Sequence, residues 1–133
     1  MGEATRSGIE TVRTFYDLMG QDRFVEASAF LSPEVVIKET SDLPFGGEFH
    51  GLEGNAELIG KMTSVFDLSI LEKTFFDAGD TIAVKLLACF TPRNGDEPMK
   101  LDIVELITVR DDRIVELDIY HKTPSAIAAH WPA

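Results

Sequence analysis

The spacing of hydrophobic residues changes near residue 67, and this change constrains the fold more than any other feature. Upstream, apolar residues recur with the period of an α-helix, and one such stripe contains Ile9, Val12, Tyr16 and Met19, with Phe15 beside it. Downstream, apolar and polar residues alternate, as along β-strands with one buried face. The alternating runs cover about residues 68–77, 81–91, 99–110 and 113–121. The chain is therefore predicted to place helices first and a sheet after them.

Capping residues indicate where two of the helices begin and end. Ser7 and Glu10 have the spacing of a capping box, and Gly20 suits the position just past a helix end. Asp22 is the expected N-cap of a second, short helix over residues 23–31, which a Ser-Pro pair ends. A third helix is expected at about residues 53–66.

The remaining segments connect or extend this layout. Residues 35–40 are β-branched and predict a strand, and residues 41–51 form a loop that carries Phe45 and Phe49. Only short turns separate the later runs, which favours antiparallel hairpins. The predicted class is α+β, with three N-terminal helices on a strongly curved antiparallel sheet, a cystatin-like cone. Helices that cover a curled sheet leave a conical cavity, where a ligand is expected.

Composition and charge narrow the function classes. The 133 residues suit one domain, with residues 1–6 and about 125–133 expected as tails, and 44% are apolar, enough for a core. A net charge of −11 argues against nucleic acid or an anionic membrane as partner. No apolar run follows Met1, so no signal peptide is predicted and a cytoplasmic location is expected. The single cysteine, Cys89, excludes an intramolecular disulfide.

Several local motifs, in this order and spacing, resemble the nuclear-transport-factor-2-like superfamily, in particular its SnoaL-like branch. They are Phe15-Tyr16-Asp17-Leu18 with Asp22, Phe30-Leu31-Ser32-Pro33-Glu34-Val35, Leu43-Pro44-Phe45-Gly46-Gly47, Gly51-Leu52-Glu53-Gly54, and the two strands that contain Glu105–Val109 and Arg113–Leu117. The resemblance runs from about Ile9 to Ile127. It implies a helix-covered cone, but this fold carries isomerases, cyclases, dehydratases and binding modules alike.

Glu39 and Glu105 are the first two candidate catalytic residues. Glu39 ends the first strand and shares a face with Val35 and Ile37; the resemblance to ketosteroid isomerases implies a carboxylate base there. Glu105 lies mid-strand on an apolar face, where a charge is costly unless it is paired or protonated. The resemblance implies that this acid holds an oxyanion. The alternatives for Glu39 are a salt bridge at the rim or simple exposure. For Glu105 they are a structural pair or an outward-facing position on its strand.

Asp118 is the third candidate catalytic residue. With Tyr120 it shares a face of the last strand with Ile114 and Glu116, and the tyrosine could donate to a ligand oxygen. A half-buried core position is the alternative for Tyr120. Many SnoaL-like chains carry Arg in place of Asp118 and Asp in place of Lys122, so this chain departs from the pattern of that branch.

The remaining candidates are aromatic residues and histidines. Tyr16, Phe45, Phe49 and His50 are expected, with Tyr120, to line the ligand pocket, although Tyr16 could equally serve core packing. His121 ends the last strand, and lone histidines at element ends are mostly exposed. No spacing of His, Cys or Asp matches a metal site, so neither a metal nor another cofactor is predicted.

Two functional hypotheses remain open. One is an enzyme that binds a small apolar carbonyl compound and isomerises, cyclises or dehydrates it by acid–base catalysis. Glu39 or Asp118 would be the base, and neutral Glu105 with a tyrosine would polarise the oxygen. The other is a binding or dimerisation module without chemistry. Because the later strands are apolar on both faces, a homodimer is expected in either case.

Overall fold

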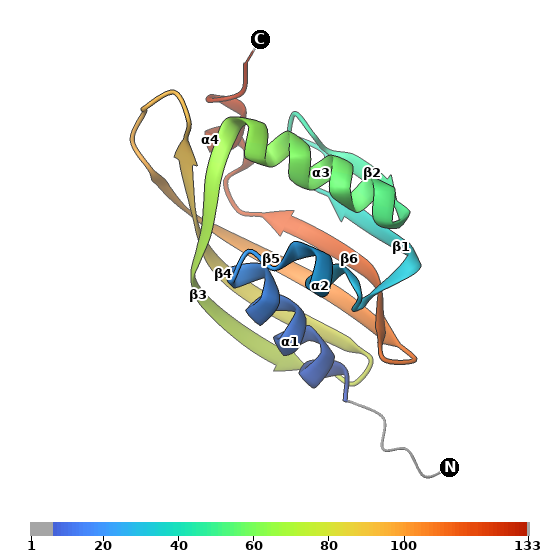
Figure 1. Ribbon diagram of the computed structural model, residues 1–133. Helices are drawn as coiled ribbons and strands as arrows, with labels where there is room; N and C mark the ends of the chain where they lie inside the picture. Colours follow the sequence, from blue (N-terminus) through green and yellow to red (C-terminus); the bar gives the residue numbers. More distant parts are fainter. Residues whose placement is uncertain (1–6, 133) are drawn as a thin grey trace, which may run out of the picture.

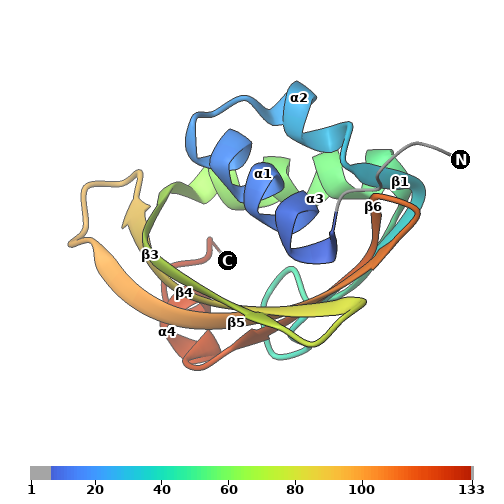
Figure 2. The ribbon, with the colours of Figure 1, turned by 90° about the horizontal axis from the view of Figure 1, so that it is seen from below.

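The structure is a computed structural model and describes residues 7–132. Its elements are α1 (Gly8–Gly20), α2 (Phe24–Ser28), β1 (Leu31–Glu39), β2 (Gly47–His50), α3 (Gly51–Val65), β3 (Phe66–Asp77), β4 (Thr81–Pro92), β5 (Met99–Arg110), β6 (Arg113–His121) and α4 (Pro124–Ala128). One six-stranded sheet has the order β2-β1-β6-β5-β4-β3. It is strongly curved, and α1, α2 and α3 lie over its concave side (Figure 1, Figure 2).

The predicted α+β class, with helices on a curved sheet, is confirmed, and all strand pairs but one are antiparallel. The exception is β1, which runs parallel to β6; the chain passes through β2, α3, β3, β4 and β5 between them. Ser7 caps α1 through the expected box: its hydroxyl accepts from the Glu10 N–H, and the Glu10 carboxylate accepts from the Ser7 N–H.

The structure differs from the expectations at four places. β1 begins at Leu31 rather than at residue 35, and it contains the Ser-Pro pair that was expected to end the second helix. Asp22 has a left-handed φ of 58°, so Arg23 rather than Asp22 precedes the shortened α2. The expected loop over residues 41–51 contains β2, which pairs with β1. Part of the expected C-terminal tail forms α4, whose Ile127 is fully buried. The expected N-terminal tail, residues 1–6, lies outside the described residues.

The core lies between the helices and the concave face. Val12 and Phe15 of α1 meet alternate residues of the central strands, such as Val84 and Ile107. An aromatic cluster at the end near α4 joins Phe45 to Trp131, with ring centroids 5.2 Å apart, and Trp131 to Phe66 at 6.5 Å. No helix within residues 7–132 is long and apolar enough to cross a membrane.

A β-bulge interrupts the alternation of β6. Thr108 pairs with Glu116 and Val109 with Ile114, so Val115 is an extra residue without a partner on β5. Ile114 and Leu117, three positions apart, are consequently both buried in the core. The bulge therefore reverses the facing of every later residue relative to a strict period of two.

Candidate functional site

A buried tyrosine and a glutamate meet beneath α1. Tyr16, 3% exposed, comes down from α1, and its phenolic O–H donates a hydrogen bond to Glu105 Oε1 on the concave face of β5. Glu105 lies between Ile103 and Ile107 on the same face of its strand, and both isoleucines are buried. The Tyr16 ring also packs edge-on against Phe75, with centroids 6.0 Å apart. The helix and the sheet thus hold one polar contact among apolar side chains.

The surroundings of this contact change the acidity of both groups. The pKa of Glu105 is raised to about 7, and burial is the largest cause. The charge of Glu39 also raises this pKa, whereas the Tyr16 hydrogen bond and the charge of His121 lower it. Burial, followed by the charge and hydrogen bond of Glu105, raises the pKa of Tyr16 well above its ordinary value. Near neutral pH Tyr16 therefore remains a donor, while Glu105 exists in both protonation states.

A second buried pair joins the ends of β1 and β6. Glu39 Oε1 lies 3.2 Å from His121 Nε2, and the two side chains are only 2% and 3% exposed. Thr40 supports the pair, because its N–H donates to Glu39 Oε1 at 3.2 Å and its Oγ1 accepts from the His121 N–H at 3.0 Å. Glu39, His121 and Glu105 influence one another electrostatically, so the two pairs form one polar cluster.

Asp118 and Tyr120 are not part of this cluster. Because of the bulge in β6 they lie on the convex face, where the Tyr120 O–H donates to Asp118 at 2.8 Å and the tyrosine is 52% exposed. The expected group of three inward carboxylates is therefore reduced to Glu39 and Glu105. The bulge is the physical reason, since a strict alternation from Ile114 would turn Asp118 inward.

The predicted pocket residues of the aromatic loop separate into two groups. Phe45 and Phe49 are buried, at 2% and 8% exposure, and belong to the core. His50 lies on the surface, where its Nε2 is 3.2 Å from Glu48 Oε1. His50 is therefore not part of the cluster, and its role in a ligand pocket stays a prediction.

His121 is a site residue that the sequence analysis expected to be exposed. Its place at a strand end suggested exposure, yet the side chain lies inside against Phe90, with ring centroids 6.3 Å apart. A signal was present in the sequence: His121 alternates with Leu117 and Ile119, and all three share the concave face.

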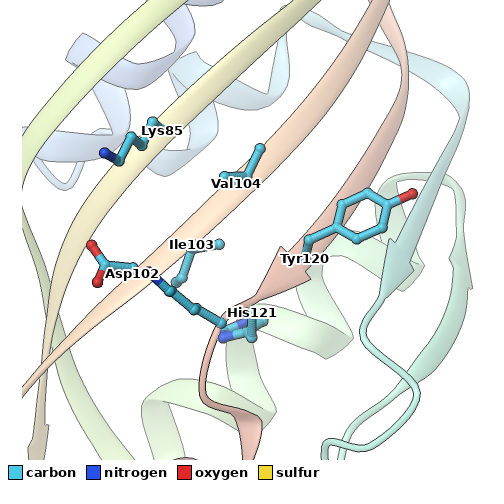
Figure 3. Close-up of a pocket in the computed structure, with 7 residues that line it drawn as sticks. Lys85, Asp102, Ile103, Val104, Tyr120 and His121 are labelled. Atoms are coloured by element: carbon cyan, nitrogen blue, oxygen red, sulfur yellow. The ribbon is translucent and has the colours of Figure 1, made fainter.

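A groove of about 330 Å³ lies on the other side of the sheet. It is lined by Lys85, Asp102, Ile103, Val104, Tyr120, His121 and Lys122. Figure 3 shows Lys85, Val104 and Tyr120 on three neighbouring strands, with helices visible behind the sheet. The groove thus carries both charges and an exposed aromatic ring. Across residues 7–132, no three His, Cys, Asp or Glu side chains are grouped so that they could hold a metal ion.

Comparisons with known proteins agree with this architecture. A family model described as a SnoaL-like domain matches residues 12–117. An NTF2-like protein from Burkholderia xenovorans LB400 is similar in structure, with a TM-score of 0.81 and 21% identity over 98% of this chain and 100% of that chain. A search of curated proteins finds no match to this chain.

Two other similar structures have informative names. TerC, co-crystallised with polyporic acid, has a TM-score of 0.81 and 22% identity over 92% of this chain and 96% of its own. A protein from Xanthomonas campestris pv. campestris, provisionally assigned as a polyketide cyclase, has a TM-score of 0.79 and 17% identity over 91% and 94%. At these identities the similarity shows the fold.

Proposed function

Because the chain belongs to the SnoaL-like domain family, we propose that it is a small-molecule enzyme that moves a proton next to a carbonyl group. The observation that carries the proposal is the Tyr16–Glu105 contact, which places a carboxyl of pKa about 7 and a phenolic donor together in an apolar interior. General acids and bases work best when their pKa lies near the operating pH.

The two pairs suit two roles in one reaction. Neutral Glu105 and Tyr16 can donate hydrogen bonds to a carbonyl oxygen and stabilise the negative charge that forms on it. The second pair, Glu39 and His121, supplies the base that removes the neighbouring C–H proton. The resulting enol can be reprotonated elsewhere, attack a second carbonyl, or lose a leaving group, which covers isomerisation, cyclisation and dehydration.

The family and the named neighbours support a small, largely apolar carbonyl compound as substrate. One neighbour holds polyporic acid and another is provisionally a polyketide cyclase, so oxygenated aromatic and polyketide-like compounds are the first to test. The Glu39 carboxylate in the cluster disfavours substrates that carry their own carboxylate next to the reacting carbon.

Exchange of the acidic C–H proton for deuterium, followed by NMR on a panel of such carbonyl compounds in D₂O, tests the proposal. We expect wild-type protein to catalyse exchange, and Glu105→Gln and Tyr16→Phe to reduce it by about 10²-fold or more. Tyr120→Phe, at the exposed tyrosine, and Glu72→Gln, at an exposed glutamate, are the matched controls and should leave exchange unchanged. Equal rates in Glu105→Gln and wild type would end the proposal.

A second candidate function, dimerisation, has support from the convex face. Val104 and Tyr120 are exposed beside Lys85, Lys122 and Asp102 (Figure 3). A two-fold copy would cover the apolar residues and set lysines opposite acids, which is how an isologous interface complements itself. Light scattering at micromolar concentration tests this: Val104→Glu should give monomers, whereas Val25→Glu, on exposed α2, should not. A wild-type monomer would exclude it.

A further inference from the structure

Glu39 is held by two hydrogen-donating neighbours. Its Oε1 lies 3.2 Å from His121 Nε2 and accepts the Thr40 N–H at the same distance. Both contacts use Oε1 as an acceptor, and a proton placed on Oε1 would disrupt them. Glu39 is therefore better placed to orient a neighbour than to accept a proton from a substrate.

His121 is fixed from several directions at once. Its backbone N–H donates to Thr40 Oγ1, and that hydroxyl donates to the Ile119 carbonyl at 2.8 Å. Phe90 packs edge-on against the imidazole ring. The ring thus has a set orientation with Nε2 toward Glu39, and because a carboxylate only accepts, the neutral imidazole carries its proton on Nε2. Nδ1 is then the nitrogen with the free electron pair.

On this geometry, and resting on the function proposed above, we propose that His121 is the catalytic base and that Glu39 is its positioning residue. In the step, His121 Nδ1 takes the proton next to the carbonyl. The electron pair of the C–H bond forms the C=C of the enol, and the carbonyl oxygen gains a hydrogen bond or proton from the Tyr16–Glu105 pair. The nearby Glu39 anion stabilises the imidazolium that forms.

The position of His121 relative to Glu105 couples the two steps. Glu105 pairs with Ile119 and His121 pairs with Ile103, so the glutamate and the histidine are diagonal neighbours on one face of adjacent strands. A positive charge on His121 lowers the pKa of Glu105. Proton uptake by the histidine therefore makes Glu105 a stronger donor at the moment when negative charge develops on the substrate oxygen.

The histidine tautomer can be measured on wild-type protein without any substrate. Long-range ¹H–¹⁵N correlation spectra of uniformly labelled protein, recorded at a pH where the ring is neutral, should show His121 as the Nε2–H tautomer. His130, whose Nδ1 lies 3.3 Å from Asp96 Oδ2, is the internal control, because the same reasoning predicts the opposite, Nδ1–H tautomer there. An Nδ1–H tautomer at His121 would overturn the inference, because Nδ1 could then not accept the substrate proton.

Deuterium exchange separates this inference from the proposed function. We expect His121→Gln to lose about 10²- to 10⁴-fold in rate and Glu39→Gln to lose less, with an altered pH profile; His50→Gln should have no effect. Added imidazole should restore part of the rate to His121→Ala. Exchange that survives in His121→Gln and is abolished in Glu39→Gln would make Glu39 the base and overturn this inference alone. No exchange by wild type would overturn both.

Discussion

Glu105→Gln should change how the stability of the protein depends on pH. The carboxyl has a pKa of about 7 in the folded protein against an ordinary value of 4.5. The folded state therefore binds this proton more tightly than the unfolded state does. The unfolding free energy is therefore highest while Glu105 is protonated in both states. It falls as pH rises above 4.5, and the loss is complete above about pH 7.

The size of the effect follows from the two pKa values. At about 1.4 kcal/mol for each pH unit, the interval from 4.5 to about 7 corresponds to roughly 3 kcal/mol. Most of this loss of unfolding free energy occurs between pH 5 and pH 8. Glutamine cannot ionise but keeps a carbonyl oxygen that can accept the Tyr16 O–H. The unfolding free energy of Glu105→Gln relative to wild type should therefore rise by about 2–3 kcal/mol from pH 5 to pH 8.

Urea unfolding followed by the fluorescence of Trp131, the single tryptophan, measures this difference. Titrations at pH 5, 6, 7 and 8 for the two proteins cancel the contributions of all the other groups. Glu72→Gln, at an exposed position, should run parallel to wild type at every pH. Parallel curves for Glu105→Gln as well would show that Glu105 ionises normally, and the reasoning from its burial would be wrong.

Three further predictions concern the same cluster and its supporting loop. Glu39→Gln should lower the pKa of Glu105, because the Glu39 charge raises it, and ¹³C NMR of the Glu105 carboxyl measures the shift. Tyr16→Phe should raise the pKa of Glu105, because it removes a hydrogen bond that stabilises the anion. An unchanged or lower pKa would contradict the Tyr16–Glu105 contact. Gly46→Ala should destabilise the protein by more than about 1 kcal/mol in urea unfolding, because a Cβ there would lie 2.5 Å from the Thr40 carbonyl oxygen, whereas Gly20→Ala, with nothing within 4 Å, should be neutral or stabilising.

The regular elements could be predicted because their signals are local. The capping box of α1 and the alternation of β3 to β6 lie within short stretches of sequence, and the observed bounds differ from the expected ones by about two residues at most. The five-residue α4 has no such signal. A helix that short depends on tertiary contacts, here the burial of Ile127 and the packing of Trp131 on Phe45.

The composition of the site depended on contacts between distant segments. Glu39 and Glu105 were candidates because each lies on an apolar face of its own strand. The burial of His121 depends on Glu39 and Phe90, which come from other strands. Its position at a strand end therefore wrongly predicted an exposed side chain. Asp118 was misplaced because the bulge at Val115 arises from pairing with β5, which the residue pattern of β6 does not reveal.

The bulge in β6 also means that one strand carries two alternative sets of reactive side chains. After Val115, the sequence alternates between a set that now faces the helices, ending in His121, and a set that now faces outward, containing Asp118 and Tyr120. A slip of one residue that paired Val115 with Thr108 would remove the bulge and exchange the two sets. A histidine-based interior would then become one based on an aspartate and a tyrosine. Deletion of Val115, by contrast, would keep the present facing, because Glu116 would still pair with Thr108. The strand pairing at this one position therefore decides which chemistry the site carries.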